Sequence, residues 1–391
     1  MTIAIDLRSI QRGTFSGVEN YTLSLLERMI REDKQNKYVL FYNGLSPKQA
    51  EDLRFLNTSV VARRIPNKLL ALSTTFARKP DFAGLIGKFD CLFMPNINHV
   101  VLGAGKRLVV TVHDLSPVVL PEYYNIRRRL WHSSVGFRRT LTRADHIIAV
   151  SEYTKQELIS VLGLPAEKIT VVYQGVDAKR FTPQIDVSVL RDVRNRYGLP
   201  GEFILYCGTL EPRKNVEGLL AAWESMEEQL PLVIAGKPGW KYQSIFARAR
   251  KSKRAKQIQF LGFVEEADKP ALYKLARVFA FPSLYEGFGL PVLEAMAVGT
   301  PVVTSSVTSL PEVCGSAAVL VNPYDHAEIA RALDVVVQDA KLRERLSAAG
   351  IAQASNFSWD KTAAETLQVL TGDTAHPSPS AAVRGPEVIV S

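Results

Sequence analysis

Two glutamates eight residues apart, Glu286 and Glu294, flank a glycine-containing loop and the start of a predicted helix. The segment FPSLYEGFGLPVLEAMAVGTPVV spans residues 281–303, and its apolar start predicts a strand over Val278–Phe281, while Pro291 suits a first helical turn. A glycine loop leading into a helix offers free backbone N–H groups and the positive end of the helix dipole, which attract phosphate. A carboxylate in that helix can accept hydrogen bonds from two ribose hydroxyls. Because the surroundings are apolar, the pattern favours a nucleotide-binding loop over a pair of solvated surface acids.

The order E-G-F-G-L-P-V-L-E resembles the E-x7-E motif of the GT4-type retaining glycosyltransferases (glycosyltransferase group 1), which have the GT-B fold. In that family the first glutamate lies by the donor sugar and the second binds the ribose. The resemblance, which covers nearly the whole chain, implies these roles for Glu286 and Glu294. It also implies that the loop approaches the sugar and the diphosphate through its backbone, at Gly287, Phe288, Gly289 and Leu290.

A second cluster, YCGTLEPRKN, spans residues 206–215 and places Arg213 and Lys214 shortly after a predicted strand and Gly208. Two cations over a diphosphate would stabilise the charge that develops on the leaving group; a solvated basic turn is the alternative. Many members of the family carry Arg directly after this glycine, whereas this chain has Thr209, so the diphosphate would rest on Arg213 and Lys214. The sequence of this segment is most similar to that of mannosyltransferases of O-antigen assembly. On this resemblance alone, GDP-mannose is the expected donor.

Three further segments match the family. QFLGFV resembles the loop whose backbone contacts the nucleobase, here Gly262, Phe263 and Val264. VVTVHDLSP places His113 after a predicted strand, where the matching family histidine supports the transition state; a lone histidine in that position is more often structural. RGTFSGVEN resembles the glycine loop of the first domain, which implies that Gly17 lies near the donor phosphate.

Short apolar runs alternate with helical patterns along the whole chain, which predicts an α/β fold. Runs such as LVVTV, HIIAV, FILYC and LVIAG are apolar on both faces, as parallel strands covered by helices require. The predicted strands are Ile3–Leu7, Tyr38–Tyr42, Cys91–Met94, Leu108–Val112, His146–Val150 and Ile169–Val172, followed by Phe203–Cys207, Leu232–Ala235, Ile258–Leu261, Val278–Phe281 and Pro301–Thr304.

These two series predict two Rossmann-like, doubly wound domains that face each other across a cleft, with ligands at the carboxyl ends of the strands. A polar, proline-containing stretch around residues 174–189 separates them. We expect an acceptor-binding domain over 1–178 and a nucleotide-sugar-binding domain over 179–356. A last helix over 357–372 is expected to return to the first domain, and 373–391 has the composition of a disordered tail.

Composition limits the class of protein. The chain has 391 residues, 47% hydrophobic and 22% charged, as is typical of globular proteins with room for two domains. No apolar run reaches the roughly 18–20 residues that span a bilayer, and the N-terminus reads as a strand, so we expect a cytoplasmic protein. The three cysteines are too scattered for a disulfide framework or a zinc site. No D-x-D motif occurs, so neither metal nor cofactor is expected.

The net charge of +9 is concentrated in two stretches, 123–143 and 237–256, that contain no acidic residue. Residues 125–142 can form a basic amphipathic helix that lies on an anionic membrane or, equally, packs on the sheet with solvated arginines. Nucleic acid is not an expected partner, because no recognition module accompanies either stretch.

Together with these features, the resemblance implies a retaining hexosyltransferase that takes a sugar nucleotide, preferably GDP-mannose, and a glycan or polyprenyl-linked acceptor in the synthesis of a bacterial surface polysaccharide. Attachment to the inner face of the cytoplasmic membrane is a further expectation. The alternatives are a UDP-sugar donor, a GT-B epimerase or phosphorylase, and a non-catalytic membrane- or nucleic-acid-binding protein.

Overall fold

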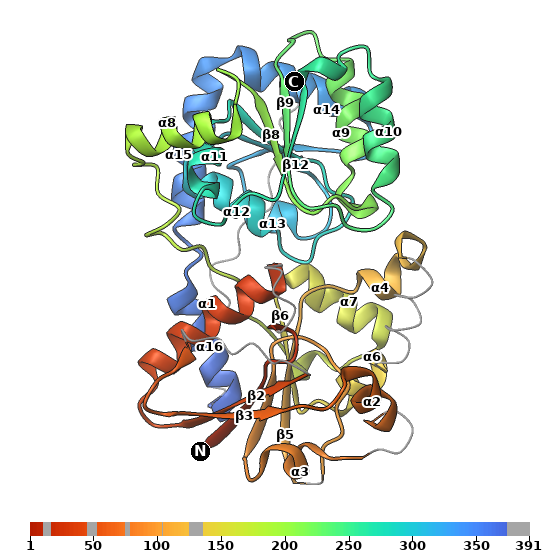
Figure 1. The fold of residues 1–391 in the computed structure, drawn as a ribbon, viewed down its shortest axis with the longest axis vertical. Coiled ribbons are helices and arrows are strands. Elements are labelled where there is room, and N and C mark those ends of the chain that lie inside the picture. Colours follow the sequence, from red (N-terminus) through yellow and green to blue (C-terminus); the bar gives the residue numbers. More distant parts are fainter. Residues whose placement is uncertain (11–16, 45–52, 75–78, 104, 125–135, 374–391) are drawn as a thin grey trace. The chain divides into compact units, whose positions relative to one another are not determined.

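The structure is a computed structural model that describes residues 1–10, 17–44, 53–74, 79–103, 105–124 and 136–373 (Figure 1). The chain forms two compact units: Met1–Gly175 with the final helix α16 (Trp359–Thr371), and Val176–Ser358. The borders expected from sequence, after residues 178 and 356, differ from these by two or three residues. The expected tail lies almost wholly outside the described residues.

The described part of the first unit contains a parallel sheet of seven strands in the order β3-β2-β1-β4-β5-β6-β7. The strands are β1 (Thr2–Asp6), β2 (Lys37–Asn43), β3 (Thr58–Arg63), β4 (Cys91–Met94), β5 (Arg107–Val112), β6 (His146–Ala149) and β7 (Ile169–Val171). The helices are α1 (Gly17–Glu32), α2 (Asn67–Leu72), α3 (Phe82–Ile86), α4 (Ser116–Val119), α6 (Phe137–Arg143) and α7 (Glu152–Leu162).

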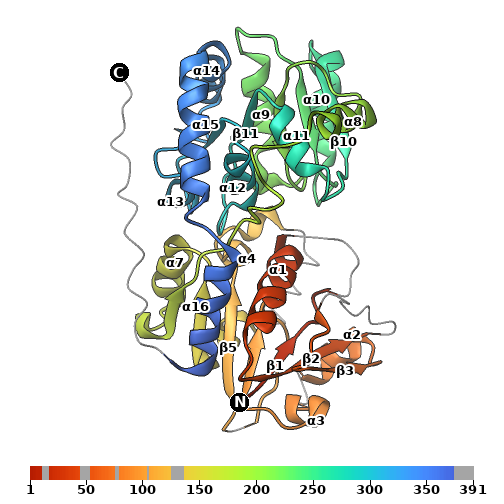
Figure 2. The ribbon, with the colours of Figure 1, turned by 90° about the vertical axis from the view of Figure 1, so that its left-hand side faces the viewer.

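Helix α16 comes from the far end of the chain and lies beside α1, as Figures 1 and 2 show. The rings of Tyr21 and Trp359 meet edge to face at 5.9 Å, and the Thr362 hydroxyl donates to the carbonyl of Tyr173 at 2.7 Å. The Arg107 guanidinium donates to the carbonyl of Val369 at 2.7 Å. These contacts make the last helix an integral part of the first unit.

The described part of the second unit contains a parallel sheet of six strands in the order β10-β9-β8-β11-β12-β13. The strands are β8 (Ile204–Cys207), β9 (Leu232–Ala235), β10 (Ile258–Gly262), β11 (Val278–Phe281), β12 (Val302–Ser305) and β13 (Val319–Val321). The helices are α8 (Val187–Tyr197), α9 (Val216–Glu224), α10 (Gln243–Lys251), α11 (Lys269–Leu275), α12 (Leu290–Ala297), α13 (Leu310–Cys314), α14 (His326–Gln338) and α15 (Ala340–Ala354).

This order is that of a doubly wound Rossmann sheet, in which the direction of strand addition reverses between β8 and β11. Ligands of such sheets bind at the carboxyl ends of the two strands at the reversal point. The residues after Cys207 and after Phe281 are therefore the ones that the fold itself singles out.

The predicted fold class, two Rossmann-like α/β domains, is confirmed. The prediction missed β3 and β13, which are edge strands. Strand β3 is largely exposed and lacks the apolar run that is typical of a buried strand, and β13 has only three residues. No helix in the described parts of the chain is long and apolar enough to cross a membrane. The predicted basic helix over 125–142 lies partly outside the described residues, which include its last part in α6.

Candidate functional site

The turn after β8 is held close to the neighbouring loop by glycines. Gly208 donates from its backbone to the carbonyl of Ala235 at 2.9 Å. Gly236 has a φ of 150°, and a Cβ there would lie 1.8 Å from the carbonyl oxygen of Gly208, so only glycine fits. Thr209, which follows, is exposed, and its hydroxyl has no partner among the described residues.

A short 3-10 turn, Pro212–Lys214, then presents the two predicted cations. Its end is fixed by Asn215, whose side chain donates to the carbonyls of Pro282 at 3.0 Å and Pro323 at 2.7 Å. The carbonyl of Arg213 accepts hydrogen bonds from the Leu284 N–H and the Ser283 hydroxyl. The turn after β8 and the loop after β11 are thus bonded together at the reversal point of the sheet.

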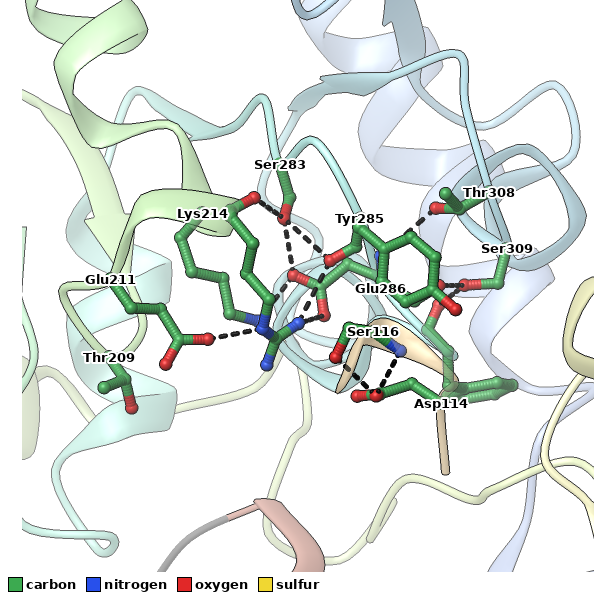
Figure 3. Close-up of polar contacts among 12 residues, drawn as sticks. Asp114, Ser116, Thr209, Glu211, Lys214, Ser283, Tyr285, Glu286, Thr308 and Ser309 are labelled. Carbon is green, nitrogen blue, oxygen red and sulfur yellow. Dashed lines mark hydrogen bonds and ion pairs between the residues drawn. The ribbon is translucent and has the colours of Figure 1, made fainter. Parts of the chain in front are cut away.

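Arg213 and Lys214 lie against two carboxylates, and Figure 3 shows Lys214 beside Glu286. Lys214 Nζ is 2.5 Å from Glu286 Oε1, and Arg213 is 3.4 Å from Glu286 Oε2. Arg213 Nε is 2.5 Å from Glu211 Oε1. The side chains are 3–16% exposed, so two cations and two anions form a largely buried cluster of zero formal charge. The structure thus brings three of the predicted catalytic residues together and adds Glu211, which the sequence interpretation overlooked.

The ionisation of this cluster follows from its pairing. Burial opposes the charge on Glu286, but the nearby Lys214 and Arg213 outweigh it and lower the pKa of the carboxyl. The Ser283 hydroxyl also donates to Glu286 Oε1 at 2.7 Å. Burial, assisted by repulsion from Arg213, lowers the pKa of Lys214. Glu286 is therefore an ionised, immobilised carboxylate at neutral pH.

The loop between Glu286 and α12 is shaped by a second glycine and by Ser309. Gly289 has a φ of 116°, and a Cβ there would lie 2.7 Å from Leu310 Cδ2, so a larger residue would be strained. The Ser309 hydroxyl lies 3.0 Å from the carbonyl of Glu286 and 2.9 Å from that of Phe288. Within the described chain, the backbone N–H groups of Gly289 and Leu290 donate to no other residue. Such free donors at a helix N-terminus are what an anionic ligand requires.

Glu294, in α12, is buried, with only 5% of its surface exposed. The hydroxyl of Tyr273 donates to its Oε2 at 2.9 Å, while Oε1 accepts no hydrogen bond from any described residue. Burial raises the pKa of Glu294 despite the opposing effect of Lys269. One oxygen of this carboxylate is therefore held by the protein and the other is left for a ligand.

The predicted nucleobase loop follows β10. The carbonyl of Gly262 accepts from the Gly236 N–H at 2.7 Å, and Val264 is buried. Phe263 is 40% exposed, and Lys237 Nζ lies 4.1 Å from the centre of its ring. A large exposed ring beside a cation is a suitable surface for a stacked base, but Lys237 was found only in the structure.

His113 and Gly17 belong to the first unit, whereas the residues above all belong to the second. His113 Nε2 is 2.8 Å from the carbonyl oxygen of Pro95, which can only accept, so Nε2 carries the hydrogen and Nδ1 is left as an acceptor. Burial lowers the pKa of His113, which favours the neutral imidazole. Gly17 starts α1, and a Cβ there would meet no atom within 4 Å.

Comparisons with known proteins agree with this geometry. Residues 193–353 match the family of glycosyl transferases group 1, and residues 15–180 match glycosyltransferase family 4. The O-antigen chain mannosyltransferase B of Escherichia coli is 38% identical over 267 residues, which are 67% of this chain and 69% of that protein. The serotype-specific mannosyltransferase WbdA of Escherichia coli is 33% identical over 275 residues, which are 68% of this chain but only 33% of the relative.

Two solved structures share the fold at low identity. HepE of Anabaena, in complex with UDP and glucose, superposes with a TM-score of 0.75 at 20% identity, covering 95% of this chain and 100% of that one. WaaG, a glycosyltransferase involved in lipopolysaccharide biosynthesis, superposes with a TM-score of 0.74 at 15% identity, also covering 95% of this chain and 100% of that one. The chain is therefore a member of the group 1, family 4 glycosyltransferases and has their GT-B fold.

Proposed function

We propose that the protein is a retaining mannosyltransferase that moves mannose from GDP-mannose to a glycan or polyprenyl-linked acceptor in bacterial surface polysaccharide synthesis. The observation that carries the proposal is the cluster of Arg213, Lys214 and Glu286 at the reversal point of the second sheet, next to the free N–H groups of α12. The mannosyl group is supported by the two O-antigen mannosyltransferases that the chain resembles.

The diphosphate of the donor would be held by Lys214, Arg213 and the N–H groups of Gly289 and Leu290. An ammonium group has three hydrogens, and Lys214 uses one of them, on Glu286, among the described residues. The remaining donors and the helix dipole would offset the charge that develops on the leaving GDP. We propose on this basis that the reaction needs no divalent metal and no cofactor.

Glu286 would stabilise the positive charge that develops at the anomeric carbon as the bond to the diphosphate breaks. Retention would follow if the acceptor attacks from the face that the diphosphate leaves. The role implied for His113, support of the transition state, stays a proposal; its neutral ring would offer Nδ1 to a sugar hydroxyl. Glu294 would bind the ribose, and Phe263 would lie against the base.

A transfer assay tests the proposal. The protein is incubated in EDTA with a mannose-terminated oligosaccharide and with GDP-mannose, UDP-glucose or UDP-galactose, and the product linkage is determined by NMR. We expect transfer from GDP-mannose, with the α configuration of the donor kept. Transfer from a UDP-sugar alone would discard mannose, a β-linked product would contradict retention, and turnover of the donor without acceptor would indicate an epimerase.

The affinity for GDP-mannose is expected to fall as the pH is lowered through the raised pKa of Glu294, because only the ionised carboxylate accepts from both ribose hydroxyls. The charged and titratable groups around it are Lys269, Glu266, Tyr273, Arg180 and Cys207. The diphosphate of GDP-mannose is a diester and does not titrate in this range. Calorimetry from about pH 8 to about pH 5 measures the effect. A Glu294→Gln variant should bind weakly and without this pH dependence; an equal slope in both proteins would contradict the assignment.

We further propose that the enzyme works in the cytoplasm, at the inner face of the membrane. In α6, Thr140 and Leu141 are buried, while Arg138, Arg139 and Arg143 are exposed, as a basic surface helix requires. We expect the protein to sediment with vesicles containing anionic phospholipid and a triple Arg→Gln variant at these positions to do so less. Equal sedimentation of both proteins would contradict this role of α6.

A further inference from the structure

Tyr273, in α11, is a buried tyrosine whose hydroxyl donates a hydrogen bond to Glu294. It is 1% exposed, and its hydroxyl donates to Glu294 Oε2 at 2.9 Å. The ring meets Phe279 edge to face at 5.2 Å and lies 6.3 Å from the ring of Phe181. The carbonyl of Tyr273 accepts from the Thr300 hydroxyl at 2.8 Å. Backbone and ring are thus fixed, and the hydroxyl donates to Glu294 Oε2 with the Cys207 thiol as its other neighbour. Burial raises the pKa of that thiol, so it is neutral and the carboxylate is the stronger acceptor.

The bond to Tyr273 decides which oxygen of Glu294 is available. A glutamate side chain has several rotatable bonds, and its freedom must be lost when a ligand binds. Tyr273 removes this freedom beforehand by occupying Oε2, while Oε1 is left without a partner among the described residues. Burial raises the pKa of Tyr273 well above its usual value, so the hydroxyl remains a donor over the whole working range.

Lys269 starts the same helix, four residues before Tyr273, and keeps a positive charge near Glu294. Lys269 Nζ is 2.5 Å from Glu266 Oε1, and Glu266 Oε2 is 2.8 Å from Arg180. Burial works against the charge on Lys269, but Glu294 and the other neighbouring acids outweigh it and raise its pKa. Lys269 and Arg180 thus favour the ionised form of Glu294, against the opposing effects of burial and of Glu266 on its pKa.

We propose that Tyr273 is a positioning residue for the donor: it fixes the Glu294 carboxylate so that Oε1 accepts from the ribose hydroxyls, while Lys269, held by Glu266 on the same helix, supplies a neighbouring positive charge. The inference rests on the ribose role of Glu294 in the proposed function. It explains why a buried glutamate can bind a ligand without first reorganising, because preorganised groups lose less freedom on binding.

Deoxynucleotides test the inference, because they lack the hydroxyls that Glu294 would bind. Affinities of GDP, 2′-deoxy-GDP and 3′-deoxy-GDP are measured by calorimetry for the wild type and for Tyr273→Phe. A hydrogen bond to a charged group accounts for about 10- to 100-fold in affinity, so the wild type should prefer GDP over the weaker-binding deoxy analogue by this factor. In Tyr273→Phe we expect GDP to bind about tenfold more weakly and that analogue to be almost unaffected.

Three variants separate the outcomes. Tyr38→Phe removes a matched buried bond, from Tyr38 to Asp33 in the first unit, and should leave the preference unchanged. Glu294→Ala should abolish the preference. Lys269→Met leaves Tyr273 in place and should weaken the binding of GDP more than the binding of either deoxy analogue. This variant provides the test if Tyr273→Phe does not fold.

A failure of the proposed function and a failure of the positioning role would give different results. A wild type without preference for GDP would overturn the ribose site in the proposed function. The positioning role alone would be overturned if Glu294→Ala abolished the preference for GDP while Tyr273→Phe and Lys269→Met kept it. If Tyr273→Phe bound all three nucleotides more weakly by the same factor, the role of Tyr273 would be merely structural. This result would also overturn the positioning role.

Discussion

Replacing Glu286 with glutamine is expected to lower kcat by about 100- to 1000-fold, the effect of removing one preorganised group from a buried transition-state site. Glutamine keeps the size of the side chain and can still accept from the Ser283 hydroxyl, so the loop should keep its shape. The lost charge is the one that would offset the developing positive charge on the sugar. Donor affinity should be unchanged or higher, because Lys214 and Arg213 would then face the diphosphate with one fewer carboxylate beside them.

Glu211→Gln is the matched control for this prediction. Glu211 is also a buried acid of the cluster, and its ion pair is with Arg213, at 2.5 Å. Both variants remove one negative charge, so both should bind GDP at least as tightly as the wild type does. We expect kcat of Glu211→Gln to stay within about tenfold of the wild type. Steady-state kinetics with GDP-mannose measure this, and an equal fall of kcat in both variants would show that the charge balance of the cluster, and not Glu286 itself, matters.

Replacing Lys214 with methionine is expected to damage both activity and stability. The ammonium group is the closest cation to Glu286, at 2.5 Å, and its loss leaves that buried carboxylate with Arg213 at 3.4 Å. Removing one partner of a buried ion pair costs about 3–5 kcal/mol of unfolding free energy. For a unit of this size, each kcal/mol corresponds to roughly 2–4 °C in Tm. The value of kcat/KM should fall about 100- to 1000-fold, since a donor to the leaving diphosphate is lost.

The double variant Lys214→Met/Glu286→Gln separates the two effects. It removes the carboxylate, which Arg213 alone would neutralise incompletely, together with Lys214, so calorimetry should show that most of the lost Tm returns. Activity should not return, because neither the cation for the diphosphate nor the carboxylate for the sugar is present. A double variant that stays as unstable as the single one would mean that Lys214 stabilises the fold by other contacts. Recovered transfer would remove both residues from the mechanism.

Positions directly after buried strands were predictable from the sequence. Gly208 and Glu286 follow runs that are apolar on both faces, and a parallel sheet brings the ends of such strands to one edge. The two glycines of the loop before α12 and the cations of the turn after β8 were found for the same reason. Local pattern thus identified the candidate site to the extent that the site is built from strand ends.

Pairing across the sheet was not predictable. That Lys214 and Glu286 neutralise each other depends on contacts between residues 72 positions apart, and no local pattern shows which acid meets which cation. Tyr273 likewise looks like an ordinary core aromatic of α11, and only the fold brings its hydroxyl to Glu294. Lys237 and Phe263 meet because β9 and β10 are neighbours, which depends on strand order and not on sequence distance.

The proposal of a metal-independent GDP-mannose site in the second unit is tested most directly by calorimetric titration in EDTA. GDP-mannose, GDP, UDP and ADP are titrated into the wild type and into Lys214→Met. We expect GDP-mannose and GDP to bind the wild type with a stoichiometry of one, UDP and ADP to bind much more weakly, and Lys214→Met to lose most of the affinity. Binding that requires an added divalent ion, or that Lys214→Met keeps in full, would contradict the proposed site.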